Sequence, residues 1–224
     1  MVMHALLLAL LLAPAAVLAQ APETLFNLVT LSAHAEREVP NDLLSAVLAA
    51  EAEGAEPAQL ANEVNRTMQR ALATAKGYRG VNARSGTYQT FPIYDKNRIT
   101  RWRARQELRL ESADFAAVTD LIGKLQASLV VTGMTLSVSP EARRQAENAL
   151  IPEALAAFDE RARLVRDAMK AKGHRVRDLQ LSGSEPVRPV FAARSMASQS
   201  VAQPAVEPGT TRIVITVSGT IQLQ

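Results

Sequence analysis

Five arginines lie close together in the segment RITRWRARQELRLES, residues 98–112. So many guanidinium groups could bind a polyanion, or they could form one hydrated face of a β-strand. Successive side chains of a strand point to opposite faces. Charged side chains take the odd positions here and apolar ones the even positions: Arg101, Arg103, Arg105, Glu107, Arg109 and Glu111 against Trp102, Ala104, Leu108 and Leu110, with Gln106 as the exception. The alternation predicts a strand whose charged face meets water or a neighbouring subunit.

Arginines on one face of a strand lie about 7 Å apart, so they repel mildly and gain from carboxylates across the sheet. Glu107 and Glu111 are candidate partners within the segment, and Glu51 and Glu53 are candidates from another strand. Exposed pairs of this kind usually contribute less than about 1 kcal/mol each. A solvated face is therefore the first interpretation, and a specific anion site is the alternative.

Aromatic side chains gather beside the arginines, although the chain is poor in aromatics. The cluster consists of Tyr88, Phe91, Tyr94 and Trp102. Rings of this kind could pack onto their own sheet, form a subunit contact or line a groove for an apolar ligand. Together with Arg101, Arg103, Arg105 and Arg109 they form the candidate interaction surface.

Other reactive residues give no catalytic, cofactor or metal pattern. The chain has no cysteine, and His34 and His174 lie far apart in the sequence, so a zinc site lacks its usual ligands. Gly-x-Gly, Gly-x-Ser-x-Gly and Ser-x-x-Lys do not occur, which removes the common phosphate loops and serine nucleophiles. Asp159 and Glu160 stand among arginines of an expected helix and are interpreted as solvated charges. The sequence predicts a non-enzymatic protein without cofactors or metals.

Hydrophobic periodicity and turn residues predict ten elements. Besides the arginine segment, strands are expected at 25–36, 43–53, 81–88, 130–138, 175–181 and 213–223, with residues 90–97 as a loop. The alanines of 43–53 also allow a helix. Helices are expected from Glu56-Pro57 to Gly77, from Asp114 to Ala127, and from Ser139 to Lys172, with a kink or a restart at Pro152. Met68, Met134 and Met169 fall on expected core positions, and Met196 falls in a loop.

The order ββαββαβαββ predicts an α+β fold. We expect two layers, with an antiparallel sheet of about seven strands and three helices on one face. Residues 20–224 are expected to form a single domain. Its Pro-, Ser- and Ala-rich segment 183–209 is expected to be a mobile loop.

The first residues, MVMHALLLALLLAPAAVLAQ, resemble an export signal. We expect a signal peptide at 1–19, cut after Ala19, with cutting after Ala21 as the alternative. Because the chain is expected to be exported, has no cysteine and has no further long apolar segment, we expect a periplasmic protein without a transmembrane segment. The formal net charge of +3 is small for a nucleic-acid binder, so no nucleic-acid partner is expected.

The segment Gly86-Thr87-Tyr88-Gln89-Thr90-Phe91-Pro92-Ile93-Tyr94, followed by Ile99 and Trp102-Arg103-Ala104, resembles the central signature of the SIMPL-domain family. The expected helix that begins at Glu56-Pro57-Ala58, with Asn62, Val64, Asn65 and Met68, is similar as well. Two departures are Ala33-His34-Ala35, where members commonly have Gly-x-Gly, and Pro40-Asn41-Asp42, where a Pro-Asp turn is usual. Both departures affect how closely another backbone can approach these two segments, because glycine has no Cβ atom to prevent such an approach.

The resemblance implies a periplasmic or secreted bacterial protein. Some relatives are described as oxidative-stress defence proteins or periplasmic immunogens, some self-assemble, and no catalytic activity is established for the family. The leading hypothesis is therefore a non-enzymatic periplasmic protein that forms a homo-oligomer and supports the cell envelope, including under oxidative or envelope stress. The alternative is a binding module that holds a small apolar or anionic ligand at the 88–102 hairpin.

Overall fold

A computed structural model describes residues 26–183 and 208–224. The expected signal peptide, Met196 and nearly all of the expected loop 183–209 lie outside these residues. The described chain contains three helices and seven strands in the predicted order: β1 (Leu28–Pro40), β2 (Leu43–Gly54), α1 (Pro57–Ala75), β3 (Asn82–Asp95), β4 (Arg98–Ser112), α2 (Phe115–Leu125), β5 (Val130–Ser137), α3 (Pro140–Ala168), β6 (His174–Gly183) and β7 (Thr210–Leu223).

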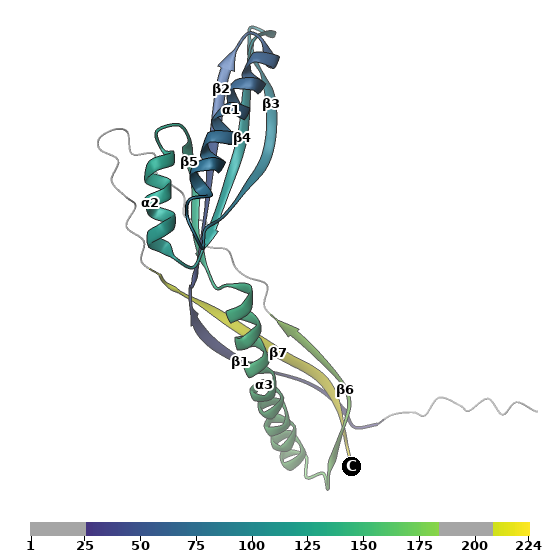
Figure 1. The fold of residues 1–224 in the computed structure, drawn as a ribbon. Coiled ribbons are helices and arrows are strands. Elements are labelled where there is room, and N and C mark those ends of the chain that lie inside the picture. The colour runs from purple at the N-terminus through teal and green to yellow at the C-terminus, as the bar shows by residue number, and fades with distance from the viewer. Residues whose placement is uncertain (1–25, 184–207) are drawn as a thin grey trace, which may run out of the picture.

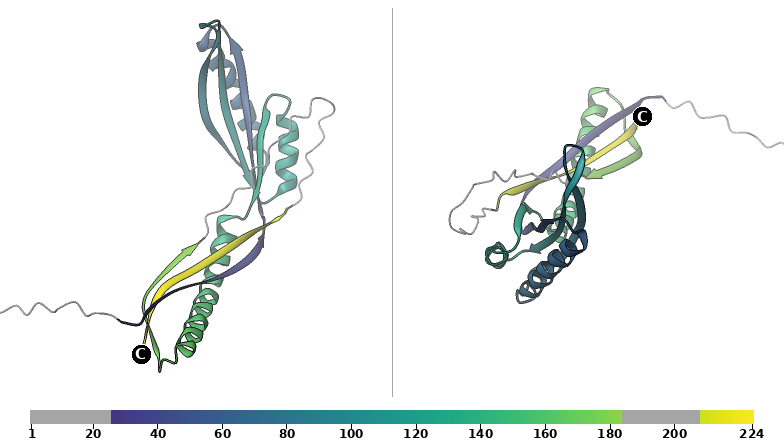
Figure 2. Two further views of the ribbon diagram at one scale, coloured as in Figure 1. Left: turned by 180° about the vertical axis from the view of Figure 1, so that it is seen from behind. Right: turned by 90° about the horizontal axis from the view of Figure 1, so that it is seen from above.

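The strands form two antiparallel sheets that lie end to end (Figures 1 and 2). One sheet has the order β3-β4-β2-β5, and the other has the order β1-β7-β6. The α+β class, the antiparallel pairing and the element order are confirmed. The strands are nevertheless divided between two sheets, because β1 pairs with β7 rather than with its neighbour in sequence.

Each sheet has its own hydrophobic core on one face. In the four-stranded sheet, even-numbered side chains of β2 and β4 pack against α1 and α2; Leu48, Leu108 and Leu110 are fully buried there. In the three-stranded sheet, odd-numbered side chains of β7 pack against α3. The spacing of Ala146, Leu150, Ala154, Phe158 and Ala162 by four residues keeps the buried stripe of α3 on one side.

Asn41 and Asp42 join the two sheets. The predicted turn at this point is a connection from β1 in one sheet to β2 in the other. The amide of Asn41 donates to the carbonyl of Gly209 at 2.9 Å, and its side-chain oxygen accepts from Thr211 at 2.6 Å. The carboxylate of Asp42 accepts from the backbone amide and the hydroxyl of Ser139, the N-cap of α3, at 2.5 and 2.7 Å. These bonds tie β1, β7 and the start of α3 together at the junction.

Two local predictions are wrong. Residues 90–95 belong to β3, which runs on to Asp95, so the expected loop shrinks to a short turn. The chain stays extended through Pro92 because β3 is an edge strand, where a missing amide proton breaks no ladder bond when it faces away from β4. Of the two alternatives expected at Pro152, a kink or a restart, the restart does not occur, because α3 is one continuous helix through this residue. Met169 was expected in the core but is 66% exposed, because α3 ends at Ala168 and its buried apolar face does not continue beyond that residue.

Candidate interaction surface

The charged face of β4 is the centre of the candidate surface, and the predicted alternation is confirmed. The side chains of Ala104, Leu108 and Leu110 are buried under the helices. Trp102 lies opposite Gly54 and packs at the rim of the same core, whereas Arg103 lies opposite Glu53 on the other face of the sheet. No helix covers that other face in Figures 1 and 2, so it carries the charges.

Carboxylates on β2 and β4 pair with the arginines as predicted. Arg103 donates to Glu53 with an Nε–Oε1 distance of 2.6 Å, and Arg105 lies 3.2 Å from Glu51. Arg109 lies 3.2 Å from Glu107, and Arg84 on β3 lies 2.7 Å from Glu111. We call these side chains, together with Arg101, the charge ladder. The charges of its five arginines and four glutamates nearly cancel. This balance favours a solvated face over a binding site for a polyanion.

Gly86 makes room for part of this ladder and was not singled out as a packing position. A Cβ atom at Gly86 would lie 3.0 Å from Cβ of Glu107 and 3.1 Å from Nε of Arg109. The pairing of β3 with β4 is also irregular between Ser85 and Tyr88. The glycine inside a strand pattern is the sequence signal for such a close approach.

The predicted aromatic cluster is divided between the two faces of the β3–β4 hairpin. Phe91 lies opposite Arg103 on the charged face, whereas Tyr88, opposite Gln106, and Trp102 lie on the helix-covered face. Tyr94 lies near the tip of the hairpin and is exposed. The cluster is therefore not one groove. The structure brings Phe91 together with Arg101 and Arg103, and it separates them from Tyr88 and Trp102.

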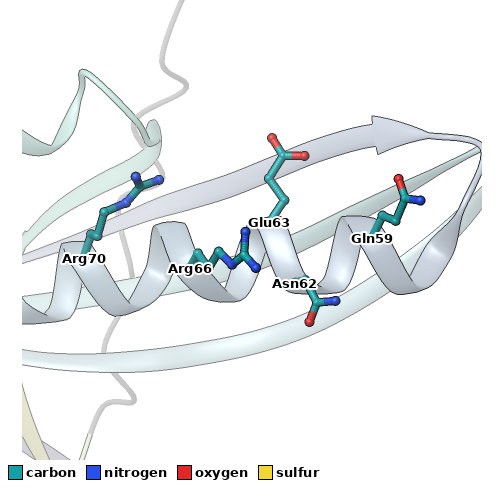
Figure 3. A pocket seen from close by; sticks show the side chains of 5 residues that line it. All are labelled: Gln59, Asn62, Glu63, Arg66 and Arg70. Atoms are coloured by element: carbon teal, nitrogen blue, oxygen red, sulfur yellow. The ribbon is translucent and has the colours of Figure 1, made fainter.

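The outer face of α1 carries a shallow hollow. Figure 3 shows its five lining side chains, which are Gln59, Asn62, Glu63, Arg66 and Arg70. All five come from one helix, and their side chains splay apart instead of converging on a common point. One carboxylate among amides and arginines supplies neither a nucleophile nor a pair of acids. We therefore interpret the hollow as part of the solvated polar face of α1.

A polar contact holds the end of α1 to α2. The hydroxyl of Tyr78 donates to Asp120 at 2.5 Å, and the ammonium of Lys124 lies 3.1 Å from Asp120 and 5.0 Å from the centre of the Tyr78 ring. The hydrogen bonds from Tyr78 and Lys124 lower the pKa of Asp120, and the interactions with Tyr78 and Asp120 raise the pKa of Lys124. Both groups stay charged at neutral pH, so this contact is structural.

The histidines do not come together. His174 lies at the start of β6, with its Nε2 atom 3.6 Å from Asp159 on α3, whereas His34 lies on β1. The Nδ1 atom of His174 is buried without a hydrogen-bond partner in the described part of the chain. Among residues 26–183 and 208–224, no three His, Asp or Glu side chains are placed to hold a metal ion. None of the helices described there has the length and apolar character needed to cross a bilayer.

A second surface was not predicted from the sequence: among the described residues, one face of β6 is apolar and has no helix packed over it. Val176, Leu179 and Leu181 lie opposite Ile221, Gly219 and Val217, so they share the face that α3 covers elsewhere in the sheet. Because α3 packs on β1 and β7, these three side chains remain 42, 40 and 48% exposed. We call them the β6 strip. In Figure 1, β6 lies at the edge of the sheet, to one side of α3.

Comparison with known proteins adds one match. Residues 29–221 match the SIMPL family, which is described as a protein of unknown function (DUF541). No curated protein matches the chain. The matched range includes both sheets and all three helices, as well as the charge ladder, the β3–β4 hairpin and the β6 strip. The chain therefore belongs to the SIMPL family.

Proposed function

We propose that this protein is a non-enzymatic periplasmic protein that self-assembles and supports the cell envelope, including under oxidative or envelope stress. The signal-like first residues support export, and membership of the SIMPL family supports a role of this general kind. Any role in oxidative stress proceeds without thiol chemistry, because the chain has no cysteine.

The observation that carries the self-assembly is the β6 strip. A sheet that is apolar on one face is stable when that face is covered, and α3 alone is too narrow to cover all three strands. In the four-stranded sheet, by contrast, two helices share the inner face. The strip is therefore the place where a second copy can complete the core.

The free edge of β6 also supports self-assembly through this strand. β6 pairs with β7 on one side, and no other described strand pairs with its opposite edge. Exposed edges with apolar side chains favour pairing with another strand. If two copies add β6 to β6 about a two-fold axis, both edges gain ladder hydrogen bonds and the two strips meet. An axis at Gln180 places Leu179 opposite Leu181 of the partner.

Mass measurement tests this interface. We expect the mature chain to have a multiple of the monomer mass in light scattering, and Leu179→Lys with Leu181→Lys to shift it towards the monomer, because a lysine at a strand edge opposes pairing. Val130→Lys is the matched control, since Val130 is an exposed apolar side chain on β5, an edge strand of the other sheet. A monomer mass for the unmodified chain across a wide concentration range contradicts the proposal.

Cross-linking tests the pairing itself. Because the chain has no cysteine, single cysteines can be placed in turn at Asp178, Gln180 and Ser182, on the face of β6 opposite the strip. Antiparallel partners lie about 4.5–5.5 Å apart at Cα, which suits a disulfide. We expect a cross-linked dimer for at least one of these positions and none for a cysteine at Gln89 on β3. Failure at all three positions counts against β6 pairing.

The second candidate function is the binding module at the 88–102 hairpin. The exposed rings beside Arg101 and Arg103 support it, but a small ligand usually needs a concave site, and these side chains lie on two faces of a ribbon. Native mass spectrometry of the purified chain tests it directly. A co-purifying small molecule that Phe91→Ala releases supports this candidate.

A further inference from the structure

The tip of the β3–β4 hairpin extends beyond its sheet. β2 ends at Gly54, which lies opposite Trp102, while β3 and β4 pair onward to Asp95 and Arg98. Residues 93–101 therefore form a two-stranded ribbon without a neighbouring strand. Lys96 and Asn97 close it, with φ of 44° and 68°, in the left-handed region that tight hairpin turns use. Figure 1 shows this tip at the end of the molecule furthest from the three-stranded sheet.

The tip carries apolar side chains that nothing in the described chain covers. Phe91, Tyr94 and Ile99 are 43, 61 and 48% exposed. Trp102 is half-buried at the base of the ribbon, where it packs against the core. Tyrosine and tryptophan side chains, which combine an apolar ring with a polar group, favour the boundary between apolar and aqueous phases.

The same tip is basic, in contrast to the charge ladder, in which positive and negative charges nearly balance. Residues 91–101, FPIYDKNRITR, contain three cations and one anion. Lys96 and Arg98 have no ion-pair partner among the described residues, and Arg101 reaches Glu53 at 3.7 Å. Further down the hairpin, Arg103, Arg105 and Arg109 all have a carboxylate within about 3.2 Å. The unpaired cations are therefore found where the apolar side chains are exposed.

We propose that the β3–β4 tip docks onto an anionic lipid surface. Docking of the ribbon by its tip would place Tyr94 and Ile99 at the level of the head groups, and Lys96 and Arg98 beside the lipid phosphates, with their alkyl stems along the apolar boundary. A second copy of the chain fits this tip less well, because the carboxylates of the charge ladder are already paired with arginines. This inference does not depend on the β6 strip.

Vesicle binding tests the proposal, and Trp102 provides the signal because it is the only tryptophan in the chain. We expect the mature chain to co-sediment with phosphatidylglycerol–phosphatidylcholine vesicles, with a blue shift of its fluorescence, and to bind pure phosphatidylcholine more weakly. Binding should weaken as salt rises, since exposed charges are screened over about 8 Å at 0.15 M. Lys96→Gln with Arg98→Gln should weaken partitioning by about thirty-fold, because each basic residue near the surface contributes about a factor of five.

Matched controls separate the tip from general charge and hydrophobicity. Arg66→Gln with Arg70→Gln makes the same change in net charge on the outer face of α1 (Figure 3) and should leave binding unchanged. Tyr94→Ser with Ile99→Ser should also weaken binding, whereas Val130→Ser, on β5, should not. Circular dichroism and a thermal melt establish that each variant is folded.

Three outcomes overturn the proposal. They are no association with anionic vesicles, equal binding to neutral vesicles that neither salt nor the tip variants change, and tip variants that alter the mass of the assembly while vesicle binding persists. The last outcome would assign the tip to a protein contact.

Discussion

Gln106 is the polar side chain that interrupts the apolar side of β4. It lies between Ala104 and Leu108 and faces Ala50 and Tyr88 on the neighbouring strands. Its Oε1 atom is buried and has no hydrogen-bond partner within the described residues. A buried oxygen that loses its water without gaining a donor costs about 1–3 kcal/mol.

Replacing Gln106 with methionine should therefore stabilise the fold. The substitution keeps the length of the side chain and removes the unsatisfied amide, so we expect the free energy of unfolding to rise by about 1 kcal/mol or more in urea titrations. Gln89→Met is the control, because Gln89 is exposed on the other face of the hairpin and its replacement should change stability by less than about 0.5 kcal/mol. A loss of stability for Gln106→Met would show that the amide is satisfied in solution.

At the same scale, much of the candidate surface could be predicted from the sequence. The two-residue alternation assigned the charges of β4 from Arg101 to Glu111 to one face, and Glu51 and Glu53 were identified as candidate cross-strand partners. It could not show that Arg84 would join the ladder, because which residue of β3 lies opposite Arg109 depends on the register of the pairing.

The β6 strip illustrates the limit of prediction at the scale of elements. Val176, Leu179 and Leu181 do not alternate strictly, because β6 has an irregularity between Val176 and Asp178 that shifts the pattern by one residue. Which face they occupy, and whether a helix covers it, depends on where α3 packs. Local periodicity predicts that a strand exists, but it does not predict what lies over it.

Gly219 on β7 accommodates this irregularity. A Cβ atom at Gly219 would collide with the carbonyl oxygen of Asp178 and would lie 2.8 Å from Cδ2 of Leu179. We expect Gly219→Ala to lower the free energy of unfolding by about 1–3 kcal/mol, as overpacking does, and to disturb β6 in particular. Hydrogen exchange of β6 amides together with a denaturant titration measures both effects.

Gly133→Ala is the control for this prediction. Gly133 also lies within a strand, but a Cβ there meets nothing within 4 Å. Its replacement should be neutral or slightly stabilising, because alanine restricts the unfolded chain more than glycine does. Equal effects of the two substitutions would contradict the close approach of β6 to β7.

At the scale of the whole molecule, the four-stranded sheet and its helices are an insertion into the other unit. Residues 43–137 supply β2, α1, β3, β4, α2 and β5, while β1 precedes them and α3, β6 and β7 follow. The two ends of the insertion are neighbours, because Leu43 pairs with Ser137. The sequence did not reveal this nesting, since it depends on the long-range pairing of β1 with β7.

Residues 43–137 should fold when expressed alone. The segment is contiguous, its ends are adjacent and its core draws on its own helices and strands. We expect a cooperative thermal transition and the fluorescence of a partly buried Trp102, as in the full chain. Non-cooperative unfolding would indicate that the bonds of Asn41 and Asp42 at the junction are needed to hold this half together.

The place of β7 in its sheet has a consequence for how the chain is made. β1 leaves the ribosome before the other described strands, yet β7, the strand that it pairs with among these, is synthesised after them. The nested half can condense in the meantime, because its contacts are nearer in sequence. Until β7 has been made, β1 thus lacks its partner strand, and we expect a chaperone that holds unfolded chains to raise the yield of folded protein.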